Sequence, residues 1–111
     1  MIEKIVLDHL KTVLDVGVFM QRPEKPPKEY VIIEKTGGTK DNNINAATFA
    51  FQSYSSTLYK AAELNQRVKA AVESLTELDE IGRVSLNSDY NFTDTATKQY
   101  RYQAVFVITH Y

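Results

Sequence analysis

The stretch from Asn45 to Leu78 contains a change of hydrophobic period, from two to about three and a half. In its first part, Ala47, Phe49 and Phe51 fall on one face of an alternating pattern, with polar and small residues between them. A period of two that is rich in aromatic residues is typical of a half-buried β-strand. We therefore expect a strand that begins close to Asn45.

The second part of this stretch predicts a helix. Apolar residues recur every three or four positions from Leu58 to Leu78, which is the spacing of one apolar helix face. A hydroxyl of Ser55 or Ser56 could accept from the free amides of the first turn. We expect a helix of about 22 residues that is about 33 Å long, and its apolar face must be covered by the rest of the fold.

The N-terminal segment has the same helical spacing. Residues 2–15 place their apolar side chains three and four positions apart, and Gly17 is well placed to end that helix. Val18–Arg22 is compatible with a short strand. The prolines that follow in residues 23–27 cannot continue a strand ladder, so we interpret that segment as an extended connector.

A further strand and a loop are expected before the central stretch. Tyr30–Lys35 is β-branched and apolar, as in a strand inside a sheet. The Gly-rich polar segment Thr36–Asn43 predicts a flexible loop, which would join two antiparallel strands. The pair Gly37-Gly38 is not followed by a helix, so it does not form the phosphate-binding loop GxxxxGK[ST].

The C-terminal part predicts two more strands. Alternation around Val84 indicates a strand that ends near Tyr90, and Asn87–Lys98 contains a second polar loop. In the last strand, Tyr100–Thr109, the distal part is apolar on both faces, which indicates a central position in the sheet. The predicted fold is one α+β domain, 1–111, with a largely antiparallel sheet of four to five strands and two helices on one face.

Composition and charge limit the functions that fit this fold. The chain of 111 residues has a formal net charge of −1 and no cysteine. A dedicated phosphate binder usually has a basic surplus, so this balance argues against a nucleic-acid-binding domain. The absence of cysteine excludes disulfides and thiolate metal sites. The first residues lack the pattern of a signal peptide, and no apolar run reaches the length of a membrane span.

The sequence offers few candidates for catalysis. His9 lies on the apolar stripe of the first helix, and we interpret it as a packed histidine with a satisfied nitrogen. His110 lies at the C-terminus, so no triad or metal site with two close histidines is expected. Asp89 and Asp94 are interpreted as acids of one solvated loop. We expect no catalytic residue, no cofactor and no metal.

Seven tyrosines and five phenylalanines make base stacking on a sheet conceivable. Tyr100 and Tyr102 with Arg101 between them fit that chemistry only loosely. The expected element order also differs from the βαββαβ order of the RNA-recognition module, so we interpret these residues as core and interface aromatics.

Several segments together resemble small structural proteins of tailed bacteriophages. They are VFMQRPEKPPKEYVIIEKTGG, the aromatic strand TFAFQSYS, the helix segment LNQRVKAAVESL, and NSDYNFTDTATKQYRYQAVFVITH at the C-terminus. The chain looks most similar to the tail terminator, or tail completion, proteins of siphophages and prophages, which are related to neck proteins. The most specific points are Pro27 with Tyr30 and Val31, and the pattern of Asp94, Thr97 and Tyr100-Arg101.

The resemblance implies a function in virion assembly without catalysis. Proteins of this kind form rings, usually hexamers, that cap the tail tube and then contact the head-completion or connector protein. The implied partners are further copies of the chain and the major tail tube protein, and the genome DNA would pass through the lumen without specific binding. The implied location is the tail or neck of the virion, after assembly in the bacterial cytoplasm, with no membrane contact.

The polar loops and one face of the sheet are the candidate assembly surfaces. Their residues are Thr36, Gly37, Gly38, Lys40, Asp41, Asn42, Asn43, Tyr54, Asp94, Tyr100, Arg101 and Tyr102. We hypothesise that Thr36–Asn43 is mobile in the free subunit and becomes ordered in the assembled neck. Two alternatives stay open: another phage neck protein, such as a head-closure protein, and a non-viral adaptor that binds proteins.

Overall fold

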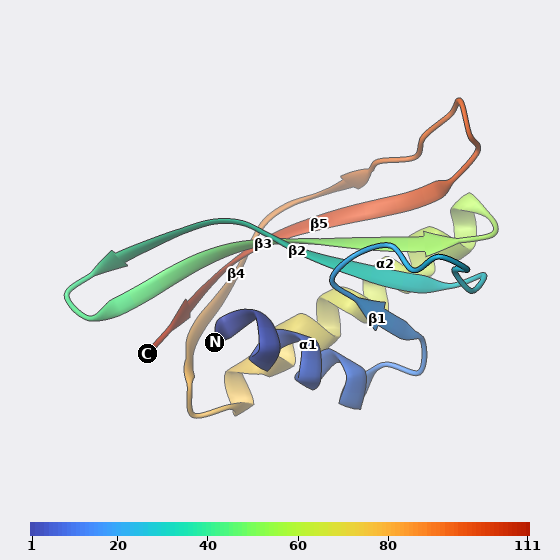
Figure 1. Ribbon diagram of the computed structural model, residues 1–111. Coiled ribbons are helices and arrows are strands. Elements are labelled where there is room, and N and C mark those ends of the chain that lie inside the picture. The colour runs from blue at the N-terminus through green and yellow to red at the C-terminus, as the bar shows by residue number, and fades with distance from the viewer.

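The computed structural model describes residues 1–111, which form a five-stranded sheet and two α-helices (Figure 1). The elements in chain order are α1 (Ile2–Val13), β1 (Gly17–Phe19), β2 (Tyr30–Asp41), β3 (Ile44–Ser55), α2 (Leu58–Glu73), the 3-10 helix η1 (Ser74–Glu77), β4 (Ile81–Asn91) and β5 (Tyr100–His110). The strand order is β1-β2-β3-β5-β4, and only the β1–β2 pair is parallel. The predicted α+β class is confirmed.

Both helices pack on one face of the sheet, as predicted, and the main core lies between these layers. The three largest side chains in that core are Phe49, Phe51 and Phe106, all with 0% exposure. They alternate with residues that face the other way, which is the pattern that predicted strands here. Loss of one such ring to alanine costs about 3–5 kcal/mol, so these positions hold the layers together.

The central stretch is a strand followed by a helix, but the helix is shorter than expected. Thr57, not Ser55 or Ser56, is the N-cap, and its side chain accepts from the amide of Lys60 at 3.1 Å. The α-helix ends at Glu73, and the chain tightens into η1, which buries Leu75 completely. The apolar stripe continues from α2 into η1, because a 3-10 turn keeps nearly the same spacing of side chains. The sequence therefore predicted one helix with the combined length of the two elements.

The N-terminal helix also ends earlier than expected. Leu14 is extended (φ −93°, ψ 147°), so the helix ends at Val13, and Gly17 begins β1 instead of ending α1. An ion pair between Asp15 and Arg67 of α2, at 2.7 Å, holds the turn between α1 and β1. The strand expected at Val18–Arg22 contains only Gly17–Phe19.

The polar segment Thr36–Asn43 is not a loop. Residues up to Asp41 continue β2, and they pair with β3 in register from Gly37 opposite Thr48 to Asp41 opposite Ile44. The only irregularity is a bulge between Lys35 and Gly37. A two-residue turn, in which Asn42 and Asn43 have φ of 48° and 66°, closes the hairpin. Asparagine tolerates this left-handed conformation, which explains how a hairpin forms without glycine there.

The second polar loop is also shorter than predicted. Strand β4 extends to Asn91, so the connection to β5 contains only residues 92–99, with an isolated bridge between Asp94 and Gln99. Asp89 therefore belongs to the strand, and it accepts from Asn65 at 2.7 Å and pairs with Lys69 at 2.5 Å. These contacts join the edge strand β4 to α2. The predicted central position of β5, between β3 and β4, is confirmed.

The molecule is elongated, with extents of 44 × 24 × 24 Å. The distal parts of β2 and β3 project beyond the helices as an arm, at the left in Figure 1. Along this arm β2 is an edge strand, since β1 pairs only with Tyr30–Ile32. None of the helices has the length and apolar character needed to cross a membrane.

Candidate assembly surface

The face of the sheet opposite the helices, here called the outer face, has a small apolar cluster at one end. Tyr30 of β2 and Tyr54 of β3 are register partners, and their rings are stacked with centroids 4.5 Å apart. Phe19 meets Tyr30 edge-on at 6.4 Å, and Ile32 completes the cluster. Tyr30, Ile32 and Tyr54 are only 4%, 8% and 8% exposed. This end of the outer face is thus covered, partly by the proline-rich connector of residues 20–29 (Figure 1).

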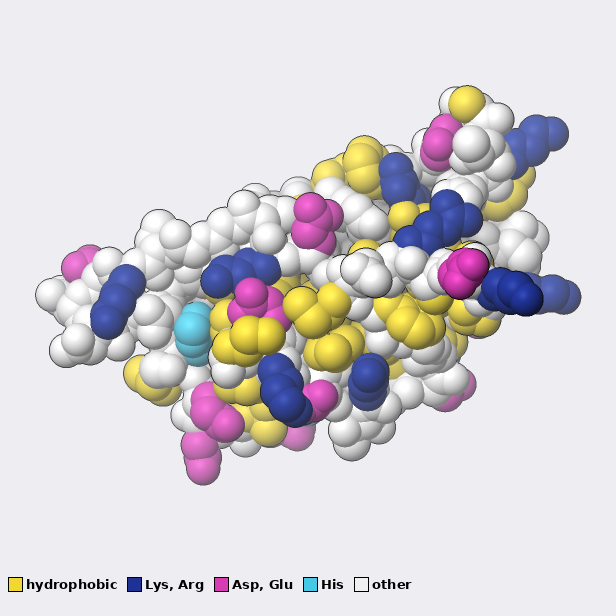
Figure 2. Space-filling model, viewed as in Figure 1, with side chains coloured by type: hydrophobic (Ala, Val, Ile, Leu, Met, Phe, Trp, Pro, Cys, Tyr) yellow, Lys and Arg dark blue, Asp and Glu magenta, His cyan; other side chains and the backbone are white.

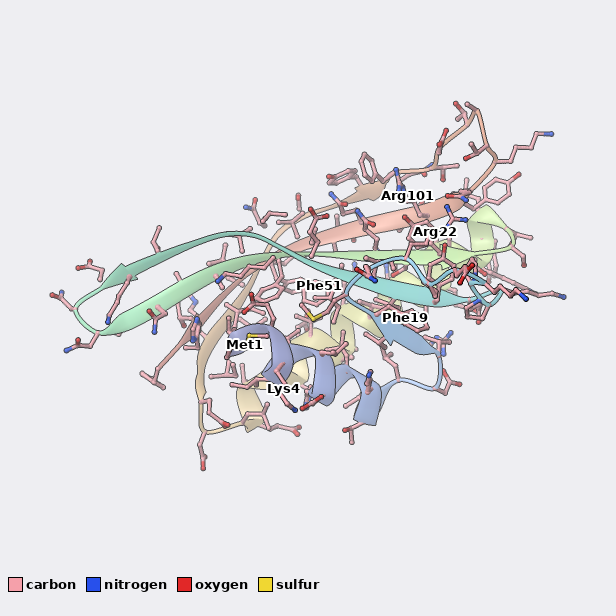
Figure 3. The ribbon with its side chains drawn as sticks, viewed as in Figure 1. Met1, Lys4, Phe19, Arg22, Phe51 and Arg101 are labelled. Atoms are coloured by element: carbon pink, nitrogen blue, oxygen red, sulfur yellow. The ribbon has the colours of Figure 1, made fainter.

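Arg101 of β5 connects that cluster to the edge strand. Its guanidinium donates to the Tyr54 hydroxyl at 2.8 Å and to the Phe92 carbonyl at 2.6 Å. The same group lies 4.3 Å from the centroid of the Phe92 ring and 5.6 Å from that of Tyr54. Figure 3 shows Arg101 and Arg22 on the side of the sheet away from the helices. A planar guanidinium can stack and donate at once, which lysine cannot.

A row of amides and hydroxyls continues across the outer face. The Tyr54 hydroxyl donates to Gln52 at 3.2 Å, Gln52 donates to Gln103 at 2.9 Å, and Gln103 donates to the hydroxyl of Tyr90. The Tyr90 and Phe92 rings meet edge-on at 5.7 Å. The outer-face network comprises Gln52, Tyr54, Tyr90, Arg101 and Gln103, from three strands, and Phe92, the first residue after β4.

The outer-face network is half covered and half open. Tyr54 and Gln103 are buried, whereas Tyr90 and Phe92 are 40% and 39% exposed at the β4 side. Burial raises the pKa of Tyr30, next to the network, and the charges of Arg22 and Arg101 oppose that effect. The hydroxyl of Tyr30 therefore stays neutral near pH 7. Chemically, the face offers fixed hydrogen-bonding groups and two accessible aromatic rings.

The candidate residues of β5 do not form one surface. Arg101 points to the outer face, but Tyr100 and Tyr102 occupy alternate positions opposite Ser55 and Ser53, on the helix-facing side. The three residues thus lie on two faces, because neighbouring side chains of a strand point to opposite faces, and their contribution to a subunit or tube contact stays a prediction. Tyr54 and Arg101 are brought together; Tyr100 instead lines a hollow at the end of the sheet.

The candidate residues between Thr36 and Asn43 all lie on the hairpin arm and are exposed. Thr36 occupies the bulge, where its hydroxyl lies 3.4 Å from the Thr48 carbonyl. On the helix-facing side of the arm, Lys35 and His110 line a shallow concavity with Lys40. Burial, and then the charge of Lys35, lower the pKa of His110. The arm is thus a polar surface far from the outer-face network.

Asp94 has a local structural function. Its carboxylate accepts from the amides of Ala96 and Thr97 at 3.0 and 3.4 Å. Hydrogen bonds from Thr97, first from its side chain and then from its backbone, lower the pKa of Asp94. Asp94 therefore organises the turn between β4 and β5, and it does not face Tyr54 or Arg101.

The side chain of His9 has a hydrogen-bonding partner. His9 lies 2.7 Å from the Ser74 hydroxyl, which in turn donates to the Ala71 carbonyl. The prediction of a partly buried histidine with a satisfied nitrogen is confirmed. No group of three or more histidine, aspartate or glutamate side chains is arranged to hold a metal ion.

Sequence reasoning missed most of the outer-face network. Gln52, Gln103 and Phe92 were not among the candidate residues, and Tyr90 was expected only as the end of a strand, yet all four join Tyr54 and Arg101. A usable signal was present, because Gln52 and Tyr54 alternate in β3 as Arg101 and Gln103 do in β5. Pairing the two strands in register would have placed all four on one face.

No protein-family model and no curated protein sequence matches this chain.

Proposed function

We propose that the protein is a structural protein of a phage tail, which caps the tail tube as a ring and forms the tail side of the head-tail joint. The sequence resemblance supports this proposal along essentially the whole chain. In this proposal the protein is not an enzyme, and its partners are other copies of itself, the tail tube protein and the head-completion protein.

The observation that carries the proposal is the outer-face network. Tyrosine, phenylalanine and arginine are enriched in protein interfaces, and here they are held by hydrogen bonds before any partner arrives. Preorganised side chains lose little conformational entropy on binding. The exposed rings of Tyr90 and Phe92 would then supply the apolar contact, and the glutamines would supply specificity.

The hairpin arm is the second supporting feature. It extends beyond the helical layer (Figure 1), and its β2 residues from Thr36 to Asp41 are exposed, so these residues are not needed to cover the core. A long polar arm is suited to reach an adjacent subunit or the neighbouring ring of a neck. The near-neutral charge of the whole chain also fits a lumen through which DNA moves without being held.

The proposal is tested by deletion and complementation in the phage or prophage that encodes the chain. Without the protein, tubes should vary in length and remain unjoined to filled heads, and the wild-type protein should restore uniform joined tails. Complementation with Phe92→Ala and Tyr90→Ala together should fail, whereas Ser88→Ala, also on β4, should succeed. Tails of normal length that are joined to heads in the deletion strain would exclude the function. Normal tube length with unjoined heads would favour the alternative, another neck protein.

A further inference from the structure

The charges of the molecule are separated between two of its ends. Residues 20–29 and 92–101 meet at one end and contain five basic and three acidic side chains, a basic surplus. At the other end, residues 73–83 contain four acidic side chains and one arginine. Figure 2 shows Lys and Arg gathered at the right-hand end and acidic side chains at the lower left. The near-zero net charge therefore hides a strong asymmetry.

The basic end is concave. A hollow of about 190 Å³ is lined by the tyrosines of the outer face and by Arg22, Lys28 and Lys98. The guanidinium of Arg22 lies 2.7 and 2.9 Å from the Gln99 amide, when that amide is oriented to accept. Lys28 and Lys98 are exposed and form no ion pair within the chain. Of the three acids at this end, Glu29 pairs with Arg67, whereas Glu24 and Asp94 form no ion pair, so this end keeps a basic surplus.

The acidic end projects as a turn at the lower left of Figure 1. It consists of η1 and the turn into β4, where Glu77, Asp79 and Glu80 are exposed. None of these carboxylates takes part in an ion pair. Asp8 of α1 lines the same surface as Glu80, but its carboxylate pairs with Lys4. The turn is fixed by backbone bonds from Leu78 to Leu75 and from Ile81 to Leu78, at 3.0 and 3.1 Å.

We propose that the acidic turn of one copy docks in the basic hollow of the next copy. Opposite uncompensated charge, and a projecting turn facing a hollow of side-chain size, point to a second copy of this chain as the occupant. Two like ends would repel, so a symmetric dimer through either end is excluded. Contacts between different patches repeat head to tail, and they close into a ring when the rotation between copies permits.

This inference rests on the proposed ring, because it names the contact that would join the subunits. Both charge clusters are exposed, so the attraction should be strong when salt is low and weak when salt is high. The exposed rings of the outer-face network, Tyr90 and Phe92, stay available for the tube or the head, since they do not line the hollow.

The test uses charge reversals at the two ends of the full chain. The first variant carries Lys28→Glu and Lys98→Glu, and the second carries Glu77→Lys and Glu80→Lys. A control carries Lys11→Glu on α1 and Lys40→Glu on the hairpin arm, both exposed and without an ion pair, and it has the same net charge as the first variant. Circular dichroism establishes that all are folded. Static light scattering then gives the second virial coefficient at about 0.01 M and about 1 M salt, where screening lengths are about 30 and 3 Å.

At low salt the wild type should show net attraction that high salt abolishes. The first variant should be clearly more repulsive than the control, although their net charges are equal, and an equimolar mixture of the two end variants should regain attraction. Equal coefficients for the first variant and the control would overturn the inference, as would a wild type without salt-dependent attraction. Such a failure would leave the tail-capping proposal intact, because tube length in particles is measured independently.

Discussion

Replacement of Arg101 by alanine tests whether the outer-face network is a rigid, preformed structure. The change removes hydrogen bonds of 2.8 Å to Tyr54 and 2.6 Å to Phe92, together with two contacts to their rings. A hydrogen bond from a charged group contributes about 1.5–3 kcal/mol, and a stacked cation about 0.5–1 kcal/mol. Arg101 is partly exposed, so water replaces some of these interactions in the variant. We therefore expect the free energy of unfolding to fall by about 2–3 kcal/mol.

The assay is urea unfolding of Arg101→Ala, with Arg83→Ala as the control. Arg83 is exposed, and its side chain has no partner in the chain, so its loss should change the free energy of unfolding by less than about 0.5 kcal/mol. In a domain of this size, Arg101→Ala should lower Tm by about 8–12 °C. Arg101→Lys should lie between the wild type and alanine, because it keeps the charge but loses the planar fork. If Arg101→Ala and Arg83→Ala were equally stable, the network would not be preformed in the free protein.

Three further predictions concern other parts of the fold. Asp89→Ala should cost about 2–3 kcal/mol in urea unfolding, because it leaves the largely buried Lys69 without its partner; a cost below that of Arg83→Ala would contradict this. Asn43→Gly should keep or raise Tm, and Asn43→Val should cost about 1–2 kcal/mol, since only glycine adopts φ of 66° without strain. The pKa of Asp94 is lowered in the folded state, so its turn should be intact above the ordinary aspartate pKa and lost as pH falls through the lowered value. The Thr97 amide shift should therefore titrate below pH 3.8 in NMR, and a midpoint at or above 3.8 would refute this.

The apolar elements were predictable from sequence because burial imposes a period. The alternation around Phe49 and Phe51 identified β3, and the two-sided apolar part of β5 correctly placed that strand inside the sheet. The three- and four-residue spacing in residues 2–15 and after Leu58 identified both helices. These periods reflect which side chains contact the core, so they can be recognised in the sequence without knowing which elements pack together.

The polar segments were misjudged because their structure depends on pairing and not on burial. The segment from Thr36 to Asp41 contains glycines and charges, yet β3 supplies it with hydrogen bonds, so it continues as a strand. Gly37 falls just after the bulge and Asn43 takes the left-handed turn position, and neither feature leaves a hydrophobic signature. The contact between Arg101 and Tyr54 likewise required the register of β5 with β3, which single-strand patterns do not contain.

The tail-capping proposal is tested most directly by electron cryomicroscopy of tail tubes mixed with the purified protein. In this proposal a phage or prophage encodes the chain, and the tubes come from its particles, assembled in a strain that lacks the protein. The proposal predicts a closed ring of several copies at one end of each tube, with the fold described here fitting each repeat of the density. Bare tube ends, or density bound along the tube walls, would contradict it.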